Sequence, residues 1–304
     1  MPAHTPFFIC LPLVLGLFGS KTKTPTEELY LAVYRNEPAA VREALANGAN
    51  INGGTPGRGD SGYKENTPLA VAAMSKNLEM MRLLIKNGAD VNARNGELSG
   101  VTALEIVIAK SAEEKRSYAK ESVREKAKDD RIAAVRLLLE NGADPKRTSR
   151  IGGSPLAAAA GTGPVEIVDM LLRKGAPVIG NGALDQPMVE CARSRDAAAP
   201  AIMERLLASG GKVNMVFAPN GECALIVAAA NGNLGVVRVL LDHGAKTGTA
   251  DRFGGTALHR AAAGNHVEVV KYLLDHGAEK RVEDQEGRTP LQRAKTDEMR
   301  GLLK

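Results

Sequence analysis

The sequence predicts an all-α repeat solenoid, in which two-helix layers of about 33 residues follow one another along the chain. Equivalent segments begin at Cys223, Thr256 and Thr289, one every 33 residues. The 304-residue chain has no Trp and only five Phe and five Tyr, so small aliphatic side chains must form its core. A glycine follows a Leu-rich stretch once per layer, in phase with the first signal: Gly48, Gly88, Gly142, Gly175, Gly210, Gly244 and Gly277.

The chain begins with an apolar run, FFICLPLVLGLF at residues 7–18. This run is shorter than the roughly twenty residues that cross a bilayer as a helix, but it has the length of a signal-peptide core. We therefore predict a signal peptide or N-terminal apolar anchor at residues 1–24, with membrane association through residues 7–18. The protein would then be exported: periplasmic, secreted or membrane-tethered. The alternative is an apolar tail on a cytoplasmic protein.

One layer illustrates how the residues specify the two helices. Thr256 can cap a short helix, TALHRAAAG, whose Ala and Leu residues give it a narrow apolar face. In the next segment, HVEVVKYLLDHG, Val270 and Leu274 lie one turn apart on one side of a second helix. Gly277 then ends that helix in the left-handed conformation, and the polar stretch VEDQEG returns the chain to the next layer as a projecting turn.

These residues resemble the ankyrin repeat. The resemblance rests on TPLAVAA at Thr67, SPLAAAA at Ser154, TALHRAA at Thr256, TPLQRA at Thr289 and the recurring LLxxGA at Leu240. It implies helix–turn–helix layers joined by projecting β-turn or hairpin loops. About eight units are expected in a domain at residues 25–304: an N-terminal cap with a long loop (27–66), repeats at 67–101, 102–153, 154–185, 186–222, 223–255 and 256–288, and a C-terminal cap (289–304).

The unit at 102–153 carries an insert at about residues 111–131, SAEEKRSYAKESVREKAKDDR. It has no Gly or Pro, and it places opposite charges three residues apart, as in Glu121 with Arg124. We expect it to lengthen both helices of that layer into a protruding antiparallel hairpin. A mobile charged loop is the alternative.

The composition and motifs argue against catalysis and against nucleic-acid binding. Lys and Arg exceed Asp and Glu by only 40 to 35, and they form no basic run. Gly57, Gly59 and Gly62 fit G-x-G-x-x-G, but no strand precedes them. The sequence has no HExxH, CxxC, nucleophile elbow or phosphate-cradling loop. We therefore expect no enzyme activity, metal or cofactor.

The resemblance implies a non-catalytic protein–protein interaction scaffold that is a monomer and binds a partner protein through its concave surface and turn tips. The alternative is a regulatory or inhibitory subunit of a partner enzyme, with the 111–131 insert as its effector arm. Phe253 is the principal candidate anchor, because aromatic and Arg side chains dominate interfaces; packing on the neighbouring turn is the alternative reading of it. The predicted partner-binding residues are Tyr63, Lys64, Arg150, Ile151, Arg252, Phe253, Arg260, Gln285, Glu286 and Arg288.

Overall fold

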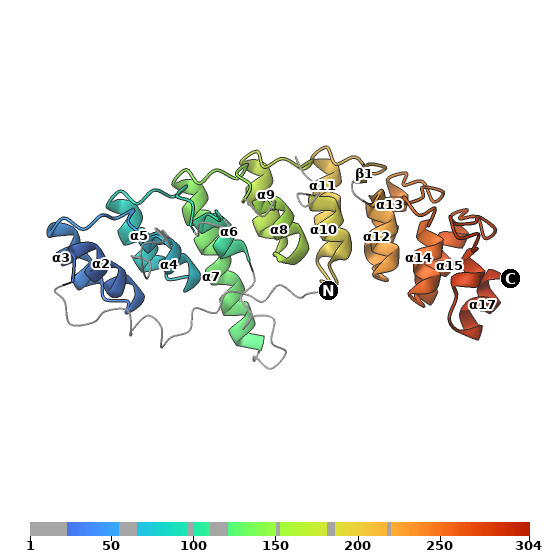
Figure 1. The fold of residues 1–304 in the computed structure, drawn as a ribbon, viewed down its shortest axis with the longest axis horizontal. Helices are drawn as coiled ribbons and strands as arrows, with labels where there is room; N and C mark the ends of the chain where they lie inside the picture. The colour runs from blue at the N-terminus through green and yellow to red at the C-terminus, as the bar shows by residue number, and fades with distance from the viewer. Residues whose placement is uncertain are drawn as a thin grey trace. The chain divides into compact units, whose positions relative to one another are not determined.

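The computed structural model consists of pairs of antiparallel helices joined by turns, which confirms the all-α repeat architecture (Figure 1). It divides into two compact units: unit 1 holds residues 1–144 and 149–151, and unit 2 holds residues 145–148 and 152–304. Within these units the structure describes residues 23–54, 66–95, 100–109, 121–149, 153–180, 186–217 and 220–304.

In unit 1, the first helix of each layer packs against the first helix of the next, α2 on α4 and α4 on α6. The second helices α5 and α7 also pack together. The helices of this unit are α2 (Pro25–Tyr34), α3 (Pro38–Ala46), α4 (Pro68–Met74), α5 (Leu78–Lys86), α6 (Ala103–Ile108) and α7 (Glu121–Glu140).

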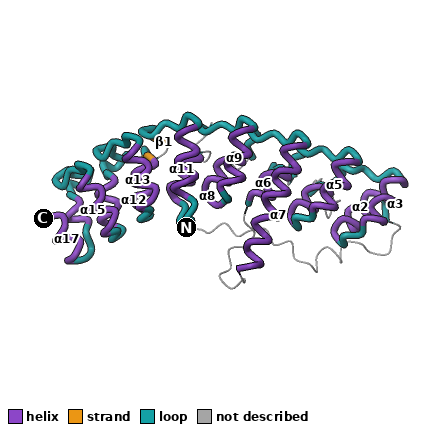
Figure 2. Tube along the Cα trace, turned by 180° about the vertical axis from the view of Figure 1, so that it is seen from behind, coloured by secondary structure: helices purple, strands orange, loops and turns teal. Residues whose placement is uncertain are grey.

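Unit 2 has the same two rows, which Figure 2 shows from the opposite side. The first helices α8, α10, α12, α14 and α16 contact one another in sequence, and so do the second helices α9, α11, α13, α15 and α17. Their bounds are α8 (Pro155–Thr162), α9 (Val165–Arg173), α10 (Pro187–Arg193), α11 (Ala199–Ala208), α12 (Ala224–Ala230), α13 (Leu234–Asp242), α14 (Ala257–Ala263), α15 (Val267–Asp275), α16 (Pro290–Arg293) and α17 (Asp297–Leu303).

Helix starts and stops follow the predicted residues. The hydroxyls of Thr67 and Ser154 accept hydrogen bonds from the amides of Ala70 and Ala157, at 3.2 and 3.1 Å. A proline follows each cap, where its missing N–H is not needed. All seven predicted helix-ending glycines have positive φ, between 79° and 98°: Gly48, Gly88, Gly142, Gly175, Gly210, Gly244 and Gly277.

The core lies between the helices of successive layers and is built from small aliphatic side chains. In unit 2, Leu240, Leu258 and Leu273 are each fully buried, among alanines such as Ala228 and Ala261 that let the helices approach closely. Repeating layers of this kind stabilise a chain that has few aromatic residues, because each layer buries its apolar face against the next one.

The loops between layers contain the short β elements that the resemblance implied. Strands β1 (Val216–Phe217) and β2 (Glu222–Cys223) pair antiparallel, and an isolated bridge joins Ala250 to Thr256 one layer later. In unit 1 an equivalent bridge joins Asn95 to Val101.

The insert in unit 1 differs in part from the expected hairpin. Helix α7 begins at Glu121 and is 20 residues long, so residues 121–131 are helical as expected for the second arm. In Figure 1 the first half of α7 extends past α5 and α6. The expected lengthening of the first helix is wrong at Ala109, where ψ is 127° and α6 has ended. The three residues before it, Ile106–Ile108, are β-branched and therefore have a low helix propensity, which is consistent with the early end of α6. Residues 110–120 lie outside the described residues.

The apolar leader also lies outside the described residues, apart from Lys23 and Thr24. Thr24 caps α2 in a reciprocal capping box with Glu27. Within the residues that the structure describes, no helix has the length and hydrophobicity to cross a membrane.

Candidate functional site

The predicted partner-binding residues that the structure describes lie together in unit 2. Arg252 and Phe253 belong to the loop before α14, and Arg260 follows on that helix. Gln285, Glu286 and Arg288 belong to the loop before α16. We call these loops the 251–255 tip and the 284–288 tip. The other four predicted residues lie outside the described ranges: Tyr63, Lys64, Arg150 and Ile151.

Backbone hydrogen bonds join successive tips. The amide of Gln285 donates to the carbonyl of Phe253 at 2.9 Å, and the amide of Arg252 donates to the carbonyl of Asn220 at 2.9 Å. Gly254 sits at this contact with φ of +75°. These bonds join the loop at Asn220, the 251–255 tip and the 284–288 tip into one hydrogen-bonded edge.

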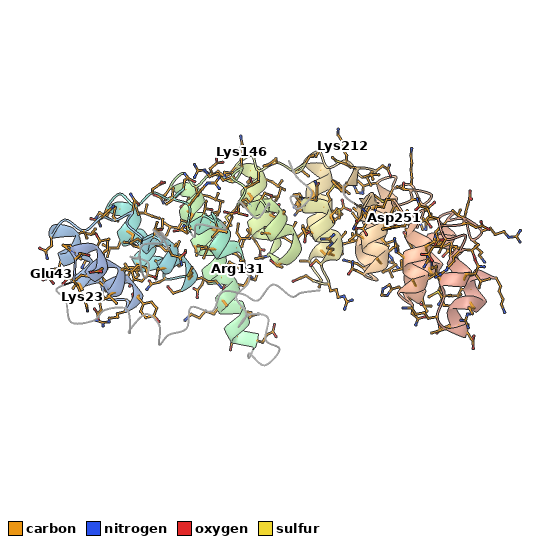
Figure 3. All side chains as sticks on the ribbon, viewed as in Figure 1. Lys23, Glu43, Arg131, Lys146, Lys212 and Asp251 are labelled. Atoms are coloured by element: carbon orange, nitrogen blue, oxygen red, sulfur yellow. The ribbon has the colours of Figure 1, made fainter. Side chains whose placement is uncertain are left out.

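A buried carboxylate sets the conformation of the 251–255 tip. Asp251 has a side chain that is 0% exposed, and Figure 3 labels it in the loop before α14. Its Oδ1 accepts from the amides of Phe253 and Gly255, at 2.8 and 3.0 Å. Its Oδ2 accepts from Nε of Arg260 at 2.9 Å and also from Nη2 of that residue. The carboxylate thus fixes the turn and the arginine of α14 together.

The same arrangement recurs 33 residues later at Asp284, whose side chain is 3% exposed. Its Oδ1 accepts from the amides of Glu286 and Arg288, at 3.0 and 3.1 Å. Its Oδ2 accepts from Nε of Arg293 at 2.7 Å. Burial alone would raise the pKa of Asp284, but the hydrogen bonds from Arg288, Arg293 and Glu286 outweigh burial and lower it.

The sequence prediction missed these two aspartates and Arg293. It named Arg260 for partner binding but did not foresee that its guanidinium binds Asp251; partner binding by Arg260 stays a prediction. A signal was present in the sequence: Asp and Arg stand nine residues apart at the same two positions in consecutive layers. That spacing joins the start of a tip to the first helix after it.

Phe253 is half exposed, at 48%, on the edge formed by the tips. The guanidinium of Arg252 stacks on its ring, 4.6 Å from the ring centre. Large apolar side chains with this exposure are few in the described part of the chain, the others being Tyr34, Met74 and Val216.

A pocket of about 290 Å³ opens beside Phe253. Two arginines, Arg260 from α14 and Arg293 from α16, contribute to its walls. The remaining lining residues are Gly255, His259, Ala263, Asp284 and Glu286. The pocket therefore combines an aromatic ring with the guanidinium groups of two consecutive layers.

His259 lines this pocket, and the hydrogen bonds of its ring are those of a neutral imidazole. Its Nδ1 accepts from the amide of Thr256 at 3.2 Å, so Nδ1 carries no proton. Its Nε2 must then carry the proton and donate to the carbonyl of Arg288 at 3.0 Å. Burial lowers the pKa of His259, which is 2% exposed.

The lowered pKa of His259 predicts a loss of stability in mild acid. Below about pH 6.5 the unfolded chain takes up a proton at this histidine that the folded chain resists, so unfolding is favoured as pH falls. We expect His259→Gln to flatten the fall of the melting temperature between pH 7.5 and 5.5. Glutamine suits this position, because Gln292 makes the same capping box with Thr289 one layer later. His276→Gln, at an exposed histidine, is the control. If the melting temperature of His259→Gln falls with pH as steeply as that of the wild-type protein, this interpretation is wrong.

The other reactive residue types give no catalytic arrangement in the described part of the chain. Burial raises the pKa of the Cys191 thiol to about 12, and its Sγ donates to the carbonyl of Ala199 at 3.2 Å. Burial also raises the pKa of Cys223. Among the described residues, no group of three or more His, Cys, Asp or Glu side chains could hold a metal ion.

Comparison with known proteins agrees with the repeat architecture. A human relative, ankyrin repeat and SOCS box protein 16, is 32% identical over 190 residues, which cover 61% of this chain and 37% of that protein. The mouse protein of the same name is 38% identical over 129 residues, 42% of this chain and 25% of the mouse protein. This chain therefore spans well under half the length of these relatives.

A solved structure and the family models extend the agreement over most of the chain. The crystal structure of the human ASB11 ankyrin repeat domain matches with a TM-score of 0.65 and 26% identity, covering 78% of this chain and 97% of that one. A model of three ankyrin repeats matches residues 18–115, 188–284 and 244–299, and a model of many ankyrin repeats matches residues 124–172. With more than half of its residues matched by these models and its helices stacked in paired rows, the chain belongs to the ankyrin repeat family.

Proposed function

We propose that this protein is a non-catalytic binding module whose partner protein docks on the 251–255 and 284–288 tips and on the adjoining face of α14 and α16. The observation that carries the proposal is Phe253, a ring 48% exposed beside a pocket on an edge that hydrogen bonds hold in place. Ankyrin repeats are in general protein–protein interaction modules, which supports the proposal that this chain binds another protein.

The physical chemistry of the edge suits an interface. Aromatic and Arg side chains supply much of the binding energy of known interfaces, and Arg252 already holds the Phe253 ring by stacking. Asp251 and Asp284 fix the two tips before any partner arrives. A surface that is ordered in advance binds with a smaller loss of conformational entropy.

Site-specific cross-linking tests this proposal. A photoreactive residue placed at Phe253 in the full-length protein should form covalent adducts with a partner in cells that make the protein. The same residue at Lys271, an exposed position on the second helix α15, serves as the control. We expect adducts from position 253. Unlabelled wild-type protein added as a competitor should suppress them, whereas Phe253→Ala protein should not. Equal adducts from position 271, or none from 253, would contradict it.

A second candidate function is control of a partner enzyme, and the length of α7 favours it. This helix has 20 residues, whereas α5 and α9 have 9 each. Exposed charges such as Glu125 and Lys126 lie on its first half. Deleting residues 111–130 should then abolish control of the enzyme's activity while the complex still forms. Loss of both together, or of neither, would argue against this candidate.

A further inference from the structure

Two arginines that line the pocket beside Phe253 each have a hydrogen-bond donor with no partner among the described residues. Asp251 and Asp284 engage the Nε and Nη2 groups of Arg260 and Arg293. In the described residues, the Nη1 groups of these two arginines make no hydrogen bond or ion pair. Both aspartates are buried, with side chains 0% and 3% exposed, so they cannot offer these donors a second partner at the surface.

Glu286 is the exposed carboxylate at this pocket. Its side chain is 57% exposed and lies between two guanidinium groups. Its Oε1 accepts from Nη2 of Arg293 at 3.0 Å, and its Oε2 is 2.8 Å from Nη2 of Arg288. The pocket therefore already holds one glutamate side chain, which comes from the protein's own tip.

This internal contact is weak enough to be exchanged. Ion pairs between exposed side chains contribute little to stability, because water competes for both charges and each side chain loses freedom. Arg293 keeps its buried bonds to Asp284 whether or not Glu286 stays in place. An incoming carboxylate would thus find an arginine that is already positioned.

An upstream layer of unit 2 is built differently. Arg193 on α10 pairs with Glu190 at 3.0 Å and with Glu222 at 4.0 Å, and both carboxylates are partly exposed. Those charges neutralise Arg193 at the surface. In the last two tips a buried aspartate binds the arginine of the following helix, and Arg293 pairs in addition with the exposed Glu286.

We propose that this pocket takes an acidic side chain of the partner, flanked by an apolar side chain that packs on Phe253, and that Glu286 occupies the acidic subsite until the partner displaces it. The inference rests on the proposed function and names the segment of the partner that docks. It commits to a side-chain carboxylate because the group now held between Arg288 and Arg293 is a glutamate side chain.

Two defined peptides test the inference on the full-length protein labelled with ¹⁵N. Acetyl-Leu-Glu-Leu-amide and acetyl-Leu-Gln-Leu-amide differ only in the charge of the central residue, and neither has a terminal carboxylate. The Nε–H resonances of Arg260 and Arg293 report occupancy of the pocket. We expect the Glu peptide to shift both resonances and to bind at least about fivefold more tightly than the Gln peptide.

Glu286→Gln provides a gain-of-binding variant, which a folding defect cannot mimic. Removing the internal competitor should tighten binding of the Glu peptide about two- to fivefold and leave the Gln peptide unchanged. Glu283→Gln is the matched control, because it removes the same charge from an exposed position next to the 284–288 tip. We expect it to change the affinity less than Glu286→Gln does.

Two results would overturn the inference: equal binding of the Glu and Gln peptides by the wild-type protein, or equal gains in Glu286→Gln and Glu283→Gln. If either occurs while cross-linking from position 253 still captures a partner, the proposed function stands and only the acidic segment is wrong. If cross-linking from position 253 fails although the Glu peptide binds as described, the acidic subsite stands and the docking proposal falls.

Discussion

Asp251→Ala is expected to destabilise the C-terminal layers by about 2–4 kcal/mol, because it removes a buried carboxylate that four donors share. The amides of Phe253 and Gly255 lose their acceptor, and the guanidinium of Arg260 loses its partner. The loss should appear in urea unfolding, and amide exchange should rise at Phe253 and Gly255.

Two further variants show whether the effect comes from the carboxylate. Glu283→Ala removes an exposed carboxylate and should change stability by less than about 0.5 kcal/mol. Arg260→Ala leaves the two backbone bonds of Asp251 in place, so we expect a smaller loss than in Asp251→Ala. Equal losses in Asp251→Ala and Glu283→Ala would show that the carboxylate does not hold the tip.

Gly254→Ala is expected to disrupt the contact between the last two tips and to cost about 2–4 kcal/mol of stability. Gly254 has φ of +75°, and a Cβ added there would lie 2.9 Å from the amide nitrogen of Gln285 and 3.0 Å from Cα of Asp284. Both contacts involve backbone, so the 284–288 tip would have to move. Thermal unfolding and the exchange rate of the Gln285 amide measure the effect.

Gly287 is the matched control for this substitution. It has φ of +70°, but an added Cβ would meet no described atom within 4 Å. Gly287→Ala therefore carries the backbone strain alone and should cost about 1–2 kcal/mol. If Gly287→Ala is as damaging as Gly254→Ala, the close approach of the tips is not what makes Gly254 necessary.

The sequence predicted the repeat architecture because periodic signals determine it. Capping residues such as Thr67 and Ser154, and glycines such as Gly244, act within one turn of a helix, so their roles can be inferred from position alone. The apolar face of each helix likewise follows from spacing. These features recur in each layer, and each occurrence supports the others.

The site was predicted less completely because its contacts join residues by side-chain geometry. Phe253 and Arg252 were identified by residue type and by their place on a tip. Asp251 resembled any polar turn residue, and only its full burial shows that it organises the tip and binds Arg260. The role of Glu286 as an occupant of the pocket depends on its distances to two arginines, which no sequence pattern reports.

The insert shows a different limit. Helix-forming residues predicted a helix at 121–131, and α7 is found there. The same reasoning lengthened the first helix past Lys110, yet Ala109 is extended. Propensity averaged over a segment does not locate the residue at which a helix ends, since one backbone rotation at that residue ends it.

Hydrogen–deuterium exchange of the full-length protein, alone and bound to the partner identified by cross-linking, tests the central claim most directly. The claim is that the two C-terminal tips and the adjoining first helices form the docking surface. It predicts slower exchange on binding in residues 251–263 and 284–293, with little change in the second helices α13 and α15. Protection confined to the second helices or to α7, with residues 251–263 unchanged, would contradict it.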